Sequence, residues 1–194
     1  MISRRWLLIS VITAACWLFL WSARAEAQNF QDVLSAVTLD FSGKGQQERA
    51  VLVQNKDDGA DLYIYLSKDD SGSESVLALA ELKKGVVFSG AMWGQLPSLD
   101  INGKGSLLIK SGNESIGRDR WTQTFTVVYR NKEFLIGGIA YTARDTLDPK
   151  GGGSCDLNLL SSKGLRNGKP IEAKLTPIKL ADWSDEKLPK ECQF

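Results

Sequence analysis

The chain has 194 residues, with 24 basic and 23 acidic side chains and no histidine. The missing histidine excludes serine–histidine triads, cysteine–histidine pairs and histidine-ligated zinc or iron sites. A formal charge of +1 supplies no strong field to attract nucleic acid or an anionic membrane, so we expect neither as a partner.

The N-terminus carries the three parts of a secretory signal peptide. Arg4 and Arg5 form a short basic region, and a continuous apolar run follows from Trp6 to Trp21. Two overlapping A-x-A cleavage sites then lie within residues 23–27. The apolar run is shorter than the about 20 residues that a spanning helix needs, which favours a cleaved signal over a permanent membrane anchor.

We therefore expect residues 1–27 to be removed on export, leaving residues 28–194 as one periplasmic or secreted domain that does not span a membrane. Two variants of the signal stay open. Ser3–Leu8 resembles a twin-arginine signal, which would imply export in the folded state, although the very apolar run suits the general secretion route better. Cys16 follows small residues and loosely resembles a lipoprotein acylation site.

The first elements of the exported part are strands and polar turns. The one helical candidate is Phe30–Ala36. Ala50–Val53 and Leu62–Leu66 are apolar and β-prone, and they flank Asn55–Gly59, which ends in Asp-Gly. Two such runs around an Asp-Gly turn predict a β-hairpin.

A short glycine-rich segment occurs twice. Leu39–Gly45 has the sequence LDFSGKG, and Leu99–Gly105 has LDINGKG. The first copy continues through Gln46–Arg49 into an apolar strand. This pattern resembles the FG-GAP (or VCBS-type) repeat of β-propellers and related exported proteins, D-x-[DN]-G-D-G-x-x-[DE] followed by a strand. More loosely, the exported part resembles small exported bacterial proteins that hold one such motif, so the resemblance implies a β-rich fold with FG-GAP-like loops.

In the FG-GAP family the loop carboxylates bind calcium, a hard cation that prefers oxygen ligands. Carried over to this chain, Asp40, Ser42 and Glu48 fall on the first, third and ninth positions. Lys44 falls on the fifth, where its ammonium would repel calcium, and Leu108 replaces the ninth-position acid of the second copy. The resemblance thus implies a structural turn that has lost its ion and needs no cofactor, with calcium at the first loop as the alternative.

Strict alternation marks the next strand, from Arg120 to Tyr129. One face carries Trp121, Gln123, Phe125, Val127 and Tyr129, while Thr122, Thr124 and Thr126 lie on the other. The alternation predicts a half-buried antiparallel strand with Trp121 in the core. Asn131-Lys132 can turn the chain, and Phe134–Thr142 predicts the returning strand.

The C-terminal third predicts further strands, Leu157–Leu160 and Ile171–Leu175, on either side of a loop at Gly164–Pro170. Lys150–Gly153 predicts a flexible loop. Strands at this spacing, joined by short polar turns, indicate one all-β domain, an antiparallel meander or sandwich-like fold whose strand order stays open.

Two cysteines remain after export, Cys155 and Cys192. In an oxidising compartment an even pair most simply forms one disulfide, which would tie the polar tail to the body. The competing interpretation, a catalytic thiolate at Cys155, lacks the histidine that usually serves as its base.

Acidic residues supply the remaining candidates for catalysis. Paired carboxylates can hydrolyse glycosides, and the candidates are Asp57, Asp58 and Asp61, or Asp145, Asp148 and Asp156. Such residues beside glycines more often form turns, which is the interpretation that we favour. Ser184 and Lys187 match the S-x-x-K arrangement of Ser-Lys enzymes, but a lysine in a charged tail keeps its proton.

Aromatic and basic side chains supply the candidates for binding. Trp93 lies in the glycine-rich loop Gly90–Gly94 and is the best candidate for an exposed contact. Together with Lys132, the residues Arg118, Arg120 and Arg130 could form a basic edge for an anionic glycan. We favour the simpler interpretation, a charged strand edge that blocks aggregation. We expect a non-catalytic exported module that binds a protein or an envelope component such as a glycan. The alternative is a carboxylate-dependent hydrolase of cell-wall or polysaccharide substrates.

Overall fold

The computed structural model describes residues 32–68, 76–90, 95–148, 150–172, 174–184 and 187–194. The expected signal peptide and Trp93 lie outside these ranges. Within them, nearly all regular structure consists of antiparallel strands, which confirms the predicted all-β class. No helix in the described ranges is long and apolar enough to cross a bilayer.

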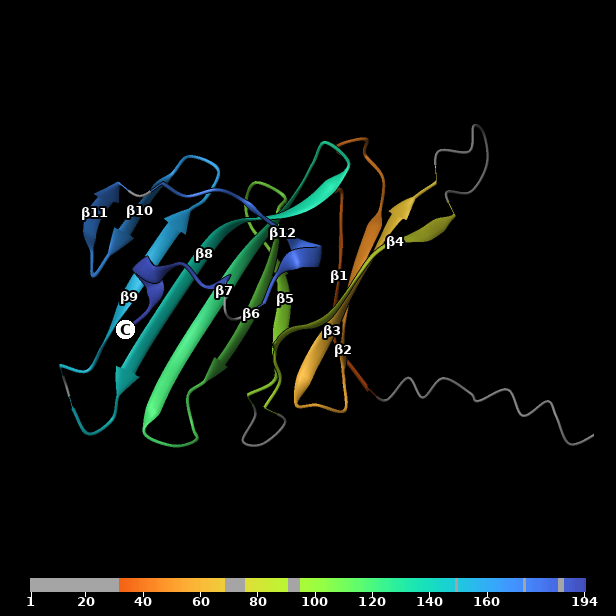
Figure 1. Cartoon of the computed structure of the whole chain (residues 1–194). Helices are drawn as coiled ribbons and strands as arrows, with labels where there is room; N and C mark the ends of the chain where they lie inside the picture. The colour runs from red at the N-terminus through yellow and green to blue at the C-terminus, as the bar shows by residue number, and fades with distance from the viewer. Residues whose placement is uncertain (1–31, 69–75, 91–94, 149, 173, 185–186) are drawn as a thin grey trace, which may run out of the picture. The chain divides into compact units, whose positions relative to one another are not determined.

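The first sheet is an antiparallel meander with the order β1-β2-β3-β4 (Figure 1). Its strands are β1 (Val33–Leu39), β2 (Glu48–Gln54), β3 (Gly59–Ser67) and β4 (Leu77–Phe88). The predicted hairpin is confirmed as β2–β3, with the N–H of Asn55 donating to the carbonyl oxygen of Gly59 at 2.9 Å. Asp58 supplies the left-handed turn conformation, at φ +53°.

The helix predicted over Phe30–Ala36 is wrong from Val33 onward, because these residues form β1 and pair with β2. The partner residues Val51 and Leu52 lie beyond a long loop, so no local pattern reveals the pairing. A seven-residue helix would be marginal by itself, whereas the sheet supplies cross-strand hydrogen bonds along the whole segment.

The second sheet has the order β11-β10-β9-β8-β7-β6-β5. Its strands are β5 (Ser98–Ile101), β6 (Leu107–Asn113), β7 (Asp119–Arg130), β8 (Glu133–Asp145), β9 (Gly152–Asn158), β10 (Lys163–Arg166) and β11 (Lys169–Glu172). The predicted β7–β8 hairpin is confirmed, and its two turn residues have the positive φ angles of a tight hairpin turn, Asn131 at +53° and Lys132 at +64°.

Two details of the C-terminal third differ from the sequence prediction. The segment predicted as a loop, Gly164–Pro170, contains most of β10 and the start of β11, so β10 separates the two strands expected there. Gly152 begins β9 rather than continuing a flexible loop. Its φ is +116°, and a Cβ at this position would collide with the carbonyl oxygen of Ala143, which explains why a glycine-rich run can enter the sheet.

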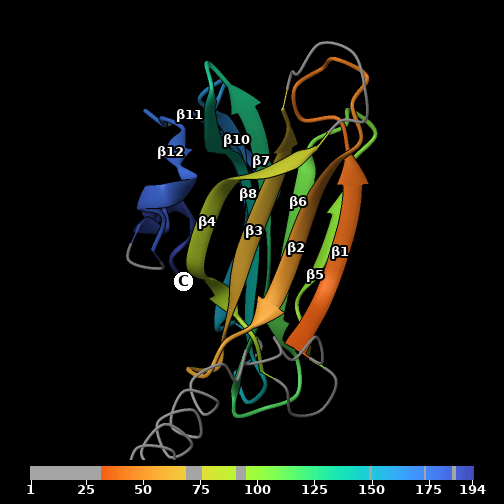
Figure 2. The same cartoon turned by 90° about the vertical axis from the view of Figure 1, so that its right-hand side faces the viewer.

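The two sheets share one hydrophobic core, in which the first sheet faces part of the second (Figure 2). The recurring glycine-rich segment connects the first strand of each meander to the second. Leu39–Gly45 leads from β1 into the β1–β2 turn, and Leu99–Gly105 leads from β5 into the β5–β6 turn. The N–H of Leu99 donates to Oγ of Ser35 at 3.0 Å, and this bond links β5 to β1 where the sheets meet.

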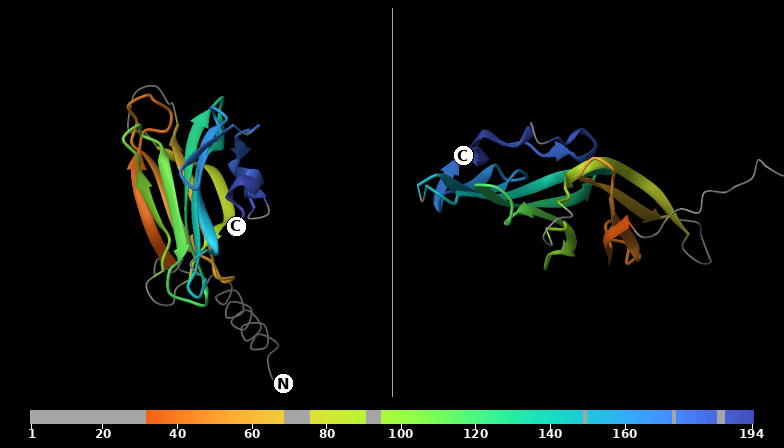
Figure 3. Two further views of the ribbon diagram at one scale, coloured as in Figure 1. Left: turned by 90° about the vertical axis from the view of Figure 1, so that its left-hand side faces the viewer. Right: turned by 90° about the horizontal axis from the view of Figure 1, so that it is seen from below.

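The C-terminal segment packs along the second sheet (Figure 3). It contains β12 (Ile178–Lys179), which pairs with β8, and the 3₁₀ turns η4 (Leu180–Asp182) and η6 (Lys190–Cys192). The predicted disulfide between Cys155 and Cys192 is confirmed, with Cα atoms 5.2 Å apart. Cys155 lies opposite Tyr141 in the β8–β9 register, so the bond fixes the segment to the core-facing side of the sheet.

Candidate functional site

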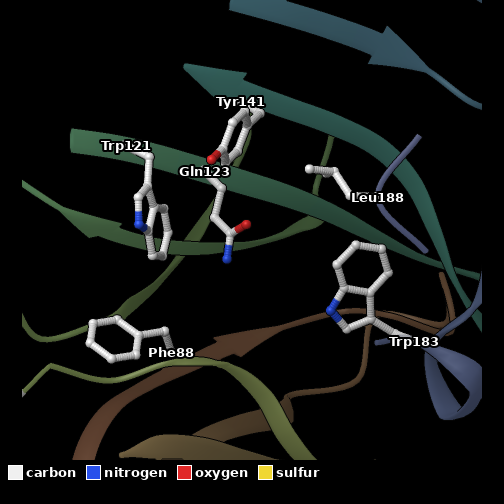
Figure 4. Close-up of a pocket in the computed structure, with 6 residues that line it drawn as sticks. All are labelled: Phe88, Trp121, Gln123, Tyr141, Trp183 and Leu188. Carbon is white, nitrogen blue, oxygen red and sulfur yellow. The ribbon is translucent and has the colours of Figure 1, made fainter. Parts of the chain in front are cut away.

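The candidate site is a pocket of about 220 Å³ at the junction of three parts of the fold (Figure 4). The first sheet, the second sheet and the C-terminal segment each contribute to its wall. The lining residues are Phe88, Trp121, Gln123, Tyr141, Trp183 and Leu188. Because the wall comes from β4, β7, β8 and the tail, the pocket exists only in the folded chain.

The alternation of side chains along β7 determines which residues form the wall that the second sheet contributes to this aromatic pocket. Trp121 and Gln123 are two residues apart on β7 and therefore project from the same face. Tyr141 of β8 lies directly opposite Gln123 in the register. Phe125, the next residue on this face, is fully buried, so β7 leads from the core into the pocket wall. Trp121, predicted as a core residue, is only half-buried and lines the pocket.

The C-terminal segment supplies the opposite wall. Trp183 follows η4 and is 2% exposed. Its indole N–H donates to the carbonyl oxygen of Val86 on β4 at 3.1 Å, and its ring meets Phe125 edge-on at a centroid distance of 4.5 Å. These contacts hold Trp183 rigidly, and the disulfide at Cys192 holds the chain beyond Leu188.

The aromatic rings of the pocket also contact one another. The rings of Phe88 and Trp121 meet at 6.0 Å with planes inclined by 61°. The rings of Trp121 and Tyr141 lie nearly parallel, at 19° and 6.3 Å. Edge-to-face and offset parallel pairs are the arrangements that aromatic rings prefer, so the wall is preorganised before any ligand enters.

Gln123 is the unusual member of the lining because it is a polar side chain in a row of core residues. It is 7% exposed, yet its amide makes no hydrogen bond within the described part of the chain. Figure 4 shows the amide directed between Trp121 and Trp183. An amide that faces a pocket can accept or donate a hydrogen bond to water or a ligand there, so Gln123 is a polar contact point in this wall.

The predicted basic residues do not gather at the pocket. Arg118 is exposed and pairs with Asp145, with Nη2 2.5 Å from Oδ2, and this hydrogen bond raises the pKa of the Arg118 guanidinium. Arg120 and Arg130 lie near opposite ends of β7, which separates them by roughly 33 Å at the usual rise per strand residue. The three arginines therefore do not form one anion site.

The first glycine-rich loop is closed by its own hydrogen bonds. The Asp40 carboxylate accepts from the N–H of Gly45 at 2.8 Å and of Lys44 at 3.1 Å, and the Gly45 bond is the largest cause that lowers the pKa of Asp40. Glu48 is 1% exposed and accepts from the N–H of Ser42 at 2.9 Å. The structure thus brings together Asp40, Ser42 and Glu48 around the turn, where the two carboxylates accept hydrogen bonds and Ser42 donates to both of them.

The second loop is held differently. The side-chain oxygen of Asn102 accepts from the N–H groups of Lys104 and Ser106, both at 2.9 Å. Asp100 pairs with Lys110 at 2.7 Å, and this hydrogen bond lowers the pKa of Asp100. Across the described ranges no cluster of three or more histidine, cysteine or acidic residues is arranged to hold a metal.

The candidate catalytic carboxylates lie outside the aromatic pocket. Asp57, Asp58 and Asp61 border an open hollow at the β2–β3 turn. Asp61 lies on β3 and accepts from the Asn55 amide at 2.9 Å and from the N–H of Gly85 on β4 at 2.8 Å, so its carboxylate joins the β2–β3 turn to the neighbouring strand. Asp145, Asp148 and Asp156 are not among the described residues that line the aromatic pocket or this hollow. In the tail, the backbone N–H of Lys187 donates to the carbonyl oxygen of Ser184.

Substitution of Asp145 by asparagine should change how stability depends on pH. The hydrogen bond from Arg118, aided by the N–H of Leu147, lowers the pKa of Asp145 to about 2. A carboxyl whose folded pKa is lowered stabilises the protein fully above its unfolded value of about 3.9, and this contribution is lost as pH falls toward 2. In urea unfolding, wild type should exceed Asp145→Asn in stability at pH 4, and the two should converge by pH 2. A constant difference across this window would contradict the pairing.

The comparisons with known proteins provide no relative from which a function could be transferred. No family model matches the chain, and neither the curated proteins nor the solved structures contain a significant match. The resemblance to FG-GAP repeats therefore rests on the two loops alone, and the aromatic pocket has to be interpreted from its own geometry.

Proposed function

We propose that this protein is a non-catalytic exported module that binds a protein or a cell-envelope component, and that the aromatic pocket is its contact site. The observation that carries the proposal is the Gln123 amide, which faces the pocket and makes no hydrogen bond with the described residues, within a preorganised aromatic wall. Binding sites typically combine a mostly apolar concave wall with a few convergent polar groups, and this pocket has that composition.

The lining favours binding over hydrolysis. Its described residues include no carboxylate, lysine, arginine or free thiol, the groups that usually transfer protons or attack bonds near neutral pH. Glycoside hydrolysis needs two carboxyl groups about 5–10 Å apart on either side of the scissile bond. The acidic residues near the open hollow, Asp57, Asp58 and Asp61, border a turn instead, so the hydrolase remains the second candidate.

The proposed location is the periplasm or the extracellular space. The N-terminal Arg4-Arg5 pair, the apolar run and the A-x-A sites support export. The disulfide between Cys155 and Cys192 suits an oxidising compartment. Removal of residues 1–27 leaves a nearly balanced charge, which suits a protein or neutral envelope partner better than an anionic polymer.

Affinity capture from crosslinked cell envelopes tests the proposal. Two tyrosine truncations form a matched pair, since both side chains are half-buried on strands: Tyr141→Ala changes the pocket, and Tyr65→Ala changes the first sheet outside the pocket lining. We expect one dominant partner with wild type and Tyr65→Ala, and its loss with Tyr141→Ala. Equal capture by all three proteins would show that the pocket is not the contact site. If the protein released reducing sugars from polysaccharide and Asp61→Asn abolished this activity, the hydrolase would be established instead.

A further inference from the structure

We propose that the aromatic pocket binds an uncharged aromatic ring that carries a single hydrogen-bonding group, and that Gln123 pairs with this group. Indole and phenol rings have this chemistry, either as free small molecules or as the tryptophan or tyrosine side chain of a partner. The inference rests on the proposed function and goes further, because it names the ligand class that the site recognises.

The volume of the pocket sets the size of the ligand. An engineered apolar cavity of about 150 Å³ binds benzene, and the pocket measures about 220 Å³. One ring or two fused rings therefore fill it. Trp121 and Phe88 lie on one side of this space and Trp183 on the other (Figure 4), so a flat ligand can contact aromatic surface on both sides.

The charges around the pocket exclude an ionised ligand. The six lining side chains in the described part of the chain are uncharged, and no described salt bridge includes any of them. A carboxylate or ammonium that entered would lose its hydration without gaining an opposite charge, which is strongly unfavourable. The group that enters is consequently neutral.

The described lining offers few polar atoms, so it suits a ligand with few hydrogen-bonding groups. The indole N–H of Trp183 is already donated to Val86, whereas the Gln123 amide faces the pocket and makes no hydrogen bond with the described residues. The amide can either accept through Oε1 or donate through Nε2. A sugar ring would bury several hydroxyl groups with too few partners, and unpaired buried hydroxyls oppose binding. An aromatic ring with one N–H or O–H leaves no such group unpaired.

The position of Gln123 supports this specificity. Its cross-strand neighbours are Tyr141 on β8 and Ser111 on β6, and the Ser111 hydroxyl is already donated to the carbonyl oxygen of Phe88 at 2.9 Å. The fully buried Phe125 continues the same row. Because its amide faces the pocket, Gln123 is placed to pair with a ligand there.

Indole and indene provide the direct test, because they share one shape and only indole has an N–H. Binding to the oxidised, exported protein can be followed by NMR through the side-chain amide of Gln123 and the indole N–H of Trp183. We expect wild type to bind indole about five- to tenfold more tightly than indene, the usual effect of one hydrogen bond. The substitution Gln123→Leu should abolish this preference, and Gln123→Met offers the same test if the first variant is unstable. Tyr65→Ala should retain it.

Two further probes separate the sources of the ring. Tighter binding of N-acetyl-tryptophanamide than of indole would support a side chain of a partner protein, whereas the reverse order would support a free small molecule. No shift of the Gln123 or Trp183 signals with indole, equal affinity for indole and indene, or preferential binding of N-acetylglucosamine would overturn the inference. If capture still depends on Tyr141 in that case, the proposed function stands and only the ligand class is wrong.

Discussion

Wild type should be more stable than the double variant Cys155→Ser, Cys192→Ser by about 3–4 kcal/mol. The bond joins residues 37 apart in sequence, and closing a loop of this size lowers the entropy of the unfolded chain by that amount. Urea unfolding of both proteins, each with and without a thiol reductant, measures the difference. Reductant should bring wild type to the stability of the double variant and leave the double variant unchanged.

The same substitution should weaken the aromatic pocket without destroying it. Trp183 remains anchored by Val86 and Phe125, whereas the chain around Leu188 loses its covalent anchor. Arg166 still donates to the carbonyl oxygens of Lys190 and Gln193, both at 3.2 Å. Indole affinity should therefore fall while the Trp183 indole signal keeps its native position. Unchanged stability after loss of both thiols would show that the tail is held by its noncovalent contacts alone.

Substitution of Phe125 by alanine should lower the free energy of unfolding by about 3–5 kcal/mol, the usual cost of truncating a buried aromatic ring. Phe125 is fully buried, lies between Ile109 and Ile139 in the register, and supports the ring of Trp183 at 4.5 Å. The variant leaves a cavity that this two-sheet core cannot easily close, because its neighbours are fixed in strands on both sides.

Thr122→Ala is the matched control for this core variant, since Thr122 lies on the same strand but is exposed on the other face. It should change stability by less than about 0.5 kcal/mol. Chemical denaturation at neutral pH measures all three proteins. A loss below about 1 kcal/mol for Phe125→Ala would mean that the core around β7 is much looser than the structure shows.

The sequence predicted those elements whose signals are local. The alternation from Trp121 to Tyr129 and the Asn131-Lys132 turn specify the β7–β8 hairpin, and the structure confirms both. The segment from Val33 was mistaken for a helix because its partner strand β2 lies beyond a loop. Strand pairing across such a distance depends on the whole sheet, and a short periodicity cannot reveal it.

The candidate site shows the same limit at the level of side chains. Trp121 was assigned to the core from its alternating position, yet it is half-buried and lines the pocket beside Phe88 of β4. Gln123 carried the one usable signal, a polar residue in an otherwise apolar row. That signal is ambiguous in sequence, because only the fold shows whether the amide has a partner.

The sequence by itself determined the β-rich class, the two principal hairpins and the cysteine pair, because side-chain alternation, turn residues and the two cysteines outside the expected signal act locally or by elimination. The tertiary structure alone decided the strand order, the burial of Trp183 in a tail that is polar by composition, and the pocket. The physical reason is that the pocket wall joins β4, β7, β8 and the C-terminal segment. Its shape and its unpaired amide therefore arise only when these distant segments pack together.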